Sequence, residues 1–138
     1  MSKPTTVISV RGRDRDVLLA DPDFLYVGRP IYRGANWKGS VWANPFKVGM
    51  KRPAAISMLG RDVDWEIRAD TVNSQLCVRF YYFWLKDQPK LLARLPELVG
   101  RTLGCWCGEW KPGELSISCH AVVLAQMANK LNVEAPTP

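Results

Sequence analysis

Three of the four cysteines and the only histidine of the chain fall between residues 105 and 120. Cys105 and Cys107 lie in a predicted strand over residues 102–107, and Cys119 and His120 follow Ser118, the predicted N-cap of the last helix. Alternate side chains of a strand share a face, so the first two thiols point the same way. A loop of eleven residues can bring the other two groups back to meet them. The segment predicts one site at the end of a strand.

Apolar periodicity predicts helices on the carboxyl side of the chain. Apolar residues recur at three- and four-residue spacing over 67–86 and predict one helix there. Pro89 and the leucines after it predict a second, shorter helix, and Gly100 then turns the chain into the strand that carries the thiols. The last helix is expected to run from Ser118 past residue 131.

The amino-terminal half predicts two strands, over residues 6–10 and 24–27, with a charged turn between them at 11–16. A long ordered loop is expected over 31–53, and few anchors and high mobility over 50–64. We therefore predict a single compact α/β domain over residues 1–138, with a small mixed sheet covered by three main helices. Its ends, at about 1–4 and 133–138, are expected to be flexible.

The net charge of +6 lies entirely in the first sixty residues, which hold ten basic and four acidic side chains. Aromatic residues alternate with these basic residues, which is the combination that attracts phosphate and stacks on rings. An anionic partner is therefore expected, although scattered basic residues can also serve only to solvate a small domain. Nine of the ten basic residues lie among aromatic ones: the basic residues are Arg11, Arg13, Arg15, Arg29, Arg33, Lys38, Lys47, Lys51 and Arg52, and the aromatic ones Tyr26, Tyr32, Trp37, Trp42 and Phe46.

No apolar stretch approaches the roughly 20 residues that a membrane span needs, and no signal sequence is apparent. The expected location is therefore cytoplasmic, without membrane contact, and the cysteines are expected to be reduced. A single histidine excludes sites that need two, and the glycine-rich phosphate loop, the dinucleotide fingerprint and the zinc deaminase pattern are absent.

The cysteine cluster allows three interpretations. Cys105, Cys107, Cys119 and His120 would complete a tetrahedral zinc site, although neighbouring residues at a helix start project about 100° apart. Alternatively, Cys119 is a reactive or anion-binding thiol at the helix start and His120 assists proton transfer, which would make these two residues catalytic. The third interpretation is that the thiols are small buried hydrophobes without chemistry.

Four motifs, taken in order, resemble one known family. They are the segments 26–29 (Tyr-Val-Gly-Arg), 42–46 (Trp-Ala-Asn-Pro-Phe), 81–85 (Tyr-Tyr-Phe-Trp-Leu) and the cysteine segment. Together they are similar to DUF4326, a small bacterial, phage and fungal domain of unknown function. This chain differs at Ala43, where the family usually has Gly, and at Val122, where it often has Asp. It also has longer loops around 31–41 and between Cys107 and Cys119.

Ligands of open α/β sheets bind at the carboxyl ends of strands, where both the Gly28-Arg29 pair and the cysteine strand end. The expected function is binding, with processing as a further option, of a nucleotide-like or other phosphate-bearing ligand beside a cluster that holds zinc. The alternative is a zinc-stapled module that binds nucleic acid through its basic half. A rigid turn is an equal interpretation of 44–46. The predicted ligand-binding residues are Gly28, Arg29, Trp42, Asn44 and Phe46.

Overall fold

A three-stranded parallel sheet forms the centre of the computed structural model, which describes residues 3–31 and 37–134. The strands are β1 (Thr6–Ser9), β2 (Phe24–Tyr26) and β3 (Thr102–Cys105), in the order β1-β3-β2. The α/β class is confirmed. The predicted mixed sheet is instead parallel in all its named strands, and the only antiparallel pairing that touches it, among the described residues, is the bridge between Val7 and Trp110.

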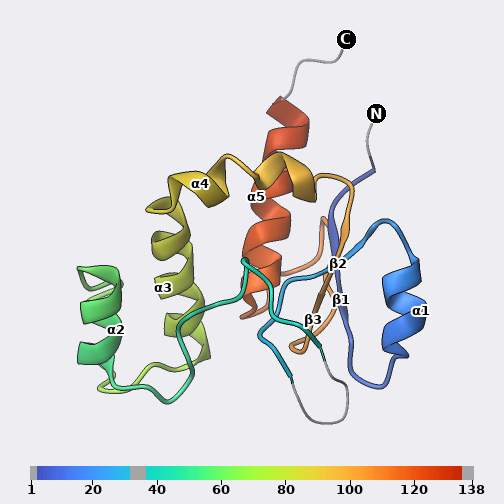
Figure 1. Cartoon of the computed structure of the whole chain (residues 1–138). Helices are drawn as coiled ribbons and strands as arrows, with labels where there is room; N and C mark the ends of the chain where they lie inside the picture. Colours follow the sequence, from blue (N-terminus) through green and yellow to red (C-terminus); the bar gives the residue numbers. More distant parts are fainter. Residues whose placement is uncertain (1–2, 32–36, 135–138) are drawn as a thin grey trace.

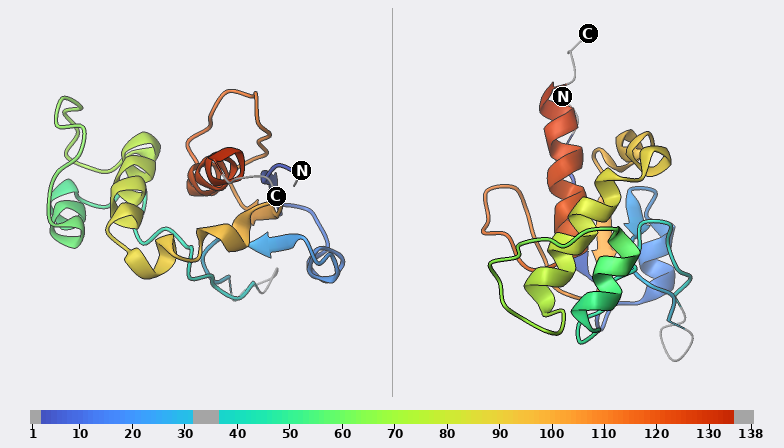
Figure 2. Two further views of the ribbon diagram at one scale, coloured as in Figure 1. Left: turned by 90° about the horizontal axis from the view of Figure 1, so that it is seen from above. Right: turned by 90° about the vertical axis from the view of Figure 1, so that its left-hand side faces the viewer.

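Helices cover both sides of the sheet, because a parallel strand must be followed by a crossover. The crossover from β1 to β2 carries α1 (Arg15–Ala20), on one side of the sheet. On the other side α5 (His120–Glu134), α3 (Ser74–Lys86) and α2 (Arg52–Leu59) follow one another outward, as both Figure 1 and Figure 2 show. The short α4 (Pro89–Leu92) and the 3-10 turn η1 (Leu95–Leu98) lead from α3 back to β3.

Three apolar clusters fill the spaces between these layers. One lies between the sheet, α5 and α3, and includes Leu103, Leu124 and Tyr81. A second lies between α2, α3 and the loop that precedes α2. A smaller third cluster lies on the α1 side and contains the stacked rings of Tyr26 and Trp37, whose centroids are 4.6 Å apart. The long loop before α2 is therefore anchored, as its aromatic residues predict.

The helix predicted over 67–86 begins only at Ser74. The Asn73 side chain accepts a hydrogen bond from the Leu76 N–H and caps the helix there. The residue before it, Val72, lies outside the helix and exchanges backbone hydrogen bonds with Gly49 and Met50. The apolar residues upstream of Asn73 thus belong to a loop that packs like a helix face without forming one.

Two helices lie where the sequence predicted none. Within the expected charged turn, the Asp14 side chain accepts from the N–H groups of Asp16 and Val17 and starts α1. The second unpredicted helix, α2, lies in the segment for which few anchors were expected. Its first residue, Arg52, is 8% exposed and donates hydrogen bonds to Asp62 and to four backbone carbonyls between residues 63 and 69.

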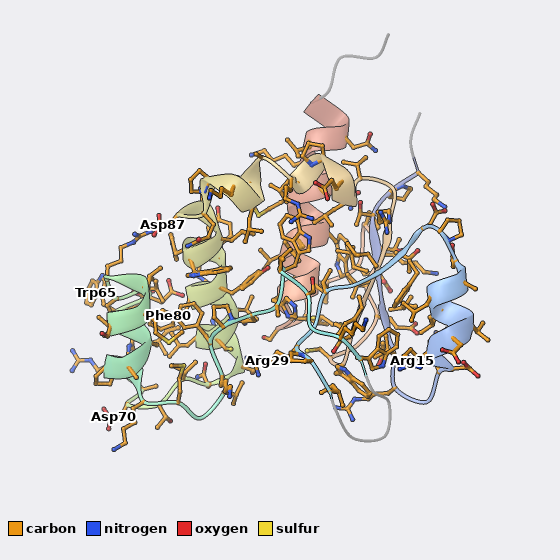
Figure 3. All side chains as sticks on the ribbon, in the orientation of Figure 1. Arg15, Arg29, Trp65, Asp70, Phe80 and Asp87 are labelled. Atoms are coloured by element: carbon orange, nitrogen blue, oxygen red, sulfur yellow. The ribbon has the colours of Figure 1, made fainter. Side chains whose placement is uncertain are left out.

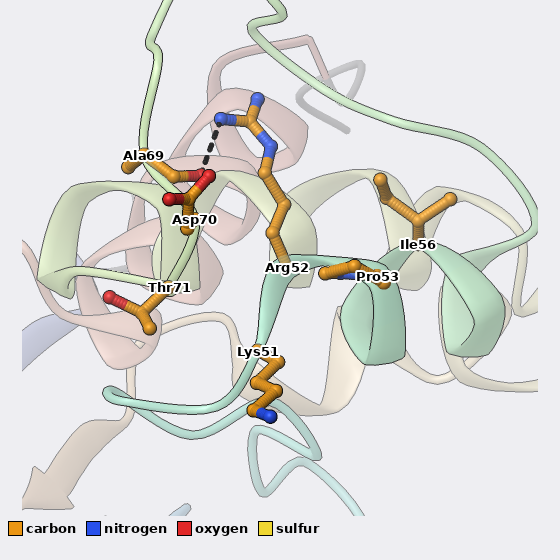
Figure 4. Close-up of a pocket in the computed structure, with 7 residues that line it drawn as sticks. All are labelled: Lys51, Arg52, Pro53, Ile56, Ala69, Asp70 and Thr71. Carbon is orange, nitrogen blue, oxygen red and sulfur yellow. Dashed lines mark hydrogen bonds between the residues drawn. The ribbon is translucent and has the colours of Figure 1, made fainter.

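Figure 4 shows Arg52 beside a cavity of about 490 Å³, between the start of α2 and residues 69–71, with its side chain bonded to the carbonyl of Ala69. A buried guanidinium bonded to several carbonyls of one loop fixes the shape of that loop. The expectation that this segment lacks anchors is therefore wrong.

The predicted flexible ends are described only in part. Residues 1–2 and 135–138 lie outside the described residues, as do Tyr32 and Arg33 from the basic and aromatic set. Within the described residues, Lys3 forms an ion pair with Asp23, and Thr5 bonds to Asn129 of α5. No helix in residues 3–31 and 37–134 is long and apolar enough to cross a membrane.

Candidate metal centre

Three cysteines converge where β3 ends and α5 begins. Cys105 is the last residue of β3, Cys107 follows in the next turn, and Cys119 directly precedes α5. Their sulfur atoms all lie within 4.8 Å of one another, and those of Cys105 and Cys119 are 3.3 Å apart. Cys105 and Cys119 are each 1% exposed, whereas Cys107 is exposed to solvent. The three thiols therefore form a cluster in which Cys105 and Cys119 are buried and Cys107 is accessible to solvent.

The fold explains this convergence. α5 is the next element after β3 and packs against this strand, and its first residue lies near the carboxyl end of β3. The N–H groups of Val122 and Val123 bond to the carbonyl of Cys119, so that residue, rather than the predicted Ser118, occupies the N-cap position. The loop over 108–118 closes the gap, as its length predicted.

Hydrogen bonds between the three thiols shift their pKa values in different directions. Cys105 accepts hydrogen bonds from Cys107 and Cys119, and these bonds lower the pKa of Cys105. The same contacts favour the protonated forms of the two donors, and burial adds to this, so the pKa values of Cys107 and Cys119 are raised. A buried thiol with a raised pKa is a poor nucleophile. The raised pKa of the buried Cys119 therefore gives no support to Cys119 as a nucleophile.

His120 does not join the cluster. Its Nε2 atom lies 2.7 Å from the carbonyl oxygen of Val27, and its ring packs edge-on against Tyr81 at a centroid distance of 5.2 Å. Burial, in the first place, lowers the pKa of His120, so the neutral ring donates from Nε2 to that carbonyl. Of the four predicted ligands, the structure therefore brings together the three cysteines and leaves His120 apart from them, because consecutive residues at a helix start point in different directions.

The turn after β1 holds the cysteine loop in place. The Val10 N–H donates to the carbonyl of Cys105 at 2.8 Å, and the Arg11 Nε donates to the carbonyl of Trp106 at 2.8 Å. The Arg11 guanidinium lies over the Trp106 ring, 5.7 Å from its centroid. On the other side, the Trp106 indole donates to the Tyr26 hydroxyl at 2.8 Å. Backbone and side chains from the ends of all three strands thus meet around this loop.

The predicted pocket residues Gly28 and Arg29 are engaged within the protein. A Cβ atom on Gly28 would lie 2.4 Å from the Tyr26 hydroxyl, so only glycine lets this turn pass so close to the ring. The Arg29 side chain, central in Figure 3, donates to the carbonyls of Asn44 and Phe46. Arg29 therefore ties the end of β2 to the next loop.

The other predicted ligand residues also make internal contacts. The Asn44 side chain accepts from the Phe46 N–H at 2.9 Å and donates to the carbonyl and sulfur of Cys77. Trp42 and Phe46 are 2% and 0% exposed, in the first and second apolar clusters respectively. The structure thus favours the rigid turn that was the alternative interpretation of residues 44–46, and it leaves Cys77 outside the cysteine cluster.

Sequence reasoning counted Arg11 only as part of the basic surface and did not assign it to the site. Its position two residues after β1 carries the missing signal, because the carboxyl ends of parallel strands meet at one edge of the sheet. Tyr26 was likewise treated as a possible stacking residue, whereas it is 6% exposed and bonds to the cysteine loop.

A model of the family described as "Domain of unknown function (DUF4326)" matches residues 10–130. The chain belongs to this family. The match confirms the resemblance inferred from the four motifs, and it includes β2, β3, the cysteine cluster and most of α5. Comparison of this DUF4326 domain with curated proteins and with solved structures found no match. Val122 is 1% exposed in the first apolar cluster.

Proposed function

We propose that this DUF4326 domain binds a zinc ion through the thiolates of Cys105, Cys107 and Cys119. The observation that carries the proposal is the convergence of their three sulfur atoms within 4.8 Å, from a strand end and a helix start. Sulfur atoms that share one tetrahedral zinc ion lie about 3.7 Å apart, given a Zn–S bond of about 2.3 Å. The cluster needs little rearrangement to reach that spacing.

The acid–base state of the cluster supports the same function. Cys105 already has a lowered pKa, so binding requires the loss of protons mainly from Cys107 and Cys119. Zinc compensates that loss, since a coordinated thiol is deprotonated by the charge of the ion. The loop is also held from both sides, by Arg11 and by Tyr26, which limits the ordering that the metal must impose.

The prediction of a nucleotide-like or phosphate-bearing ligand has less support at Arg29 and Asn44 than zinc has at the cysteine cluster. Arg29 and Asn44 are the polar residues predicted to bind that ligand. Arg29 donates instead to the carbonyls of Asn44 and Phe46, and Asn44 donates to the carbonyl of Cys77 in α3. The alternative, a nucleic-acid-binding module, has less support. Trp37, Trp42 and Phe46 are at most 3% exposed, so their rings are not available to stack on bases.

Zinc binding is tested by metal analysis of protein purified without an affinity tag, followed by replacement with Co²⁺. We expect one zinc per chain, thiols that a chelator makes reactive, and an absorption spectrum of cobalt bound to thiolates. Cys105→Ser, Cys107→Ser and Cys119→Ser should each weaken metal binding at least tenfold.

Two matched variants serve as controls. Cys77→Ser changes the one cysteine outside the cluster, and His120→Gln keeps an N–H that can bond to Val27. Both should keep the metal. Metal-free protein whose thiols titrate freely, and which takes up neither zinc nor cobalt, would refute the proposed function.

A further inference from the structure

Three thiolates leave one position of a tetrahedral zinc ion to be filled. The chain has four cysteines and one histidine, so Cys77 and His120 are the only other thiol or imidazole groups. Cys77 bonds to Asn44 and to the carbonyl of Phe46, and His120 bonds to Val27. No carboxylate of the described residues joins the cluster either. Within residues 3–31 and 37–134 no side chain is thus placed to be the fourth ligand, which leaves that position to a ligand from outside the chain.

Access to the cluster is possible from one side only. Cys105 and Cys119 are buried, and the first apolar cluster of the core includes both. Cys107 is exposed and stands next to Trp106, which is half-buried. An external ligand consequently reaches the metal on the Cys107 side, past the turn that follows β1.

Arg11 is the cation that faces this entry. Its Nε atom is fixed on the carbonyl of Trp106, the residue before Cys107, and its guanidinium rests on the Trp106 ring. Within the described part of the chain Arg11 makes no ion pair, whereas its neighbour Arg13 pairs with Glu109 at 2.9 Å. An exposed guanidinium held in place without a carboxylate partner is suited to bind an incoming oxygen anion through its free N–H groups.

We propose that a small oxygen anion, a carboxylate or a phosphate group, fills the fourth zinc position and is held there by Arg11. This inference rests on the proposed zinc site. Three thiolates give the metal centre a net charge of −1, which disfavours a further anion unless a cation stands beside it. The Arg11 charge offsets that repulsion, and a bidentate guanidinium distinguishes an oxygen anion from a halide.

The test uses the full chain loaded with Co²⁺, whose visible absorption reports a change of ligand. Acetate and inorganic phosphate are titrated separately at constant ionic strength, with chloride as the comparison anion. We expect a saturable spectral change with acetate, phosphate or both, and a tenfold or larger loss of affinity in Arg11→Met. Arg68→Met removes an equal charge from an exposed residue of the loop between α2 and α3 and should leave the affinity unchanged.

The outcomes separate the two proposals. If no cobalt–thiolate absorption forms, the proposed zinc site fails. If that absorption forms but neither oxygen anion changes it, or if Arg11→Met binds them as well as the wild type does, the zinc site stands and the present inference is overturned. Should Arg11→Met fail to fold, Arg11→Lys keeps the charge without the planar fork, and we expect it to bind the anions more weakly than the wild type.

Discussion

The sulfur atoms of Cys105 and Cys119 lie 3.3 Å apart, although fourteen residues separate the two cysteines in the chain. A disulfide has an S–S distance of about 2.05 Å, so the two atoms need to move about 1.3 Å closer to form one. In metal-free protein we expect hydrogen peroxide to join them, each thiol losing one hydrogen and the peroxide becoming two molecules of water.

Peptide mapping by mass spectrometry after alkylation identifies the product of this oxidation. Zinc should protect both sulfurs and slow the reaction, because the coordinated thiolates are no longer free to attack each other. The prediction is contradicted if the main product is any disulfide other than Cys105–Cys119, or if zinc leaves the rate unchanged.

The buried hydroxyl of Tyr81 is expected to make the folded protein less stable at alkaline pH. Its hydroxyl donates to the carbonyl of Trp42 at 2.7 Å, and burial first, then the nearby Cys119, raises its pKa above 10.0. The unfolded chain releases this proton at lower pH than the folded chain does. The contribution of Tyr81 to the free energy of unfolding is therefore complete below pH 10 and is lost as the pH rises above that value, by at most about 1.4 kcal/mol per pH unit.

Urea unfolding between pH 8 and pH 11 measures this effect. Tyr81→Phe should cost about 1–2 kcal/mol at pH 8, because the Trp42 carbonyl loses its donor, and should show a shallower alkaline loss than the wild type. Tyr82→Phe, on the same helix and only half-buried, is the control and should follow the wild-type slope. Equal slopes for the wild type and Tyr81→Phe would contradict the prediction.

Gly104 is required by the packing of Phe24 against β3. A Cβ atom at residue 104 would lie 2.5 Å from the Phe24 ring and 2.9 Å from a Val10 methyl group. Gly104→Ala should therefore lower the free energy of unfolding by about 1–3 kcal/mol, the usual cost of overpacking. Phe24→Leu, which removes the crowded end of the ring, should cost less in the Gly104→Ala background than in the wild type. Additive effects of the two substitutions, measured by denaturant unfolding, would refute this steric explanation.

Replacing Arg52 is expected to lower the stability of the whole protein and to loosen the loop that its side chain contacts. Its guanidinium donates hydrogen bonds to Asp62 and to the carbonyls of residues 63, 64, 67 and 69. The single ammonium group of a lysine cannot reach all five acceptors. Arg52→Lys should lower the free energy of unfolding by about 2–4 kcal/mol, since buried carbonyls lose their donor. Hydrogen exchange should accelerate over residues 61–72 and remain unchanged in β3 and α5.

Arg61→Lys is the control for this experiment, because Arg61 belongs to the same loop and its one ion pair, with Asp87, is exposed. Uniform acceleration across the whole chain in Arg52→Lys would show that Arg52 stabilises the fold in general rather than this loop.

Local patterns predicted most of the secondary structure. β-branched runs and apolar spacing, which act over a few residues, predict the three strands and the last helix. The strands end at Ser9, Tyr26 and Cys105, and the helix begins after Cys119. The same patterns could not reveal that Arg52 organises α2 and the loop after it. All five of its acceptors lie ten to seventeen residues further along the chain, so they meet only once the loop has folded.

In the candidate site, too, some features follow from the sequence and others only from the folded structure. The sequence by itself indicated that Cys105, Cys107 and Cys119 can meet, because alternate residues of a strand share a face and a loop of eleven residues is long enough to bring Cys119 back. It could not determine that His120 turns to Val27, that Arg29 and Asn44 are used within the core, or that Arg11 lies over Trp106. Those contacts join residues 15 to 95 positions apart, and only the parallel order of the three strands brings them to one edge of the sheet.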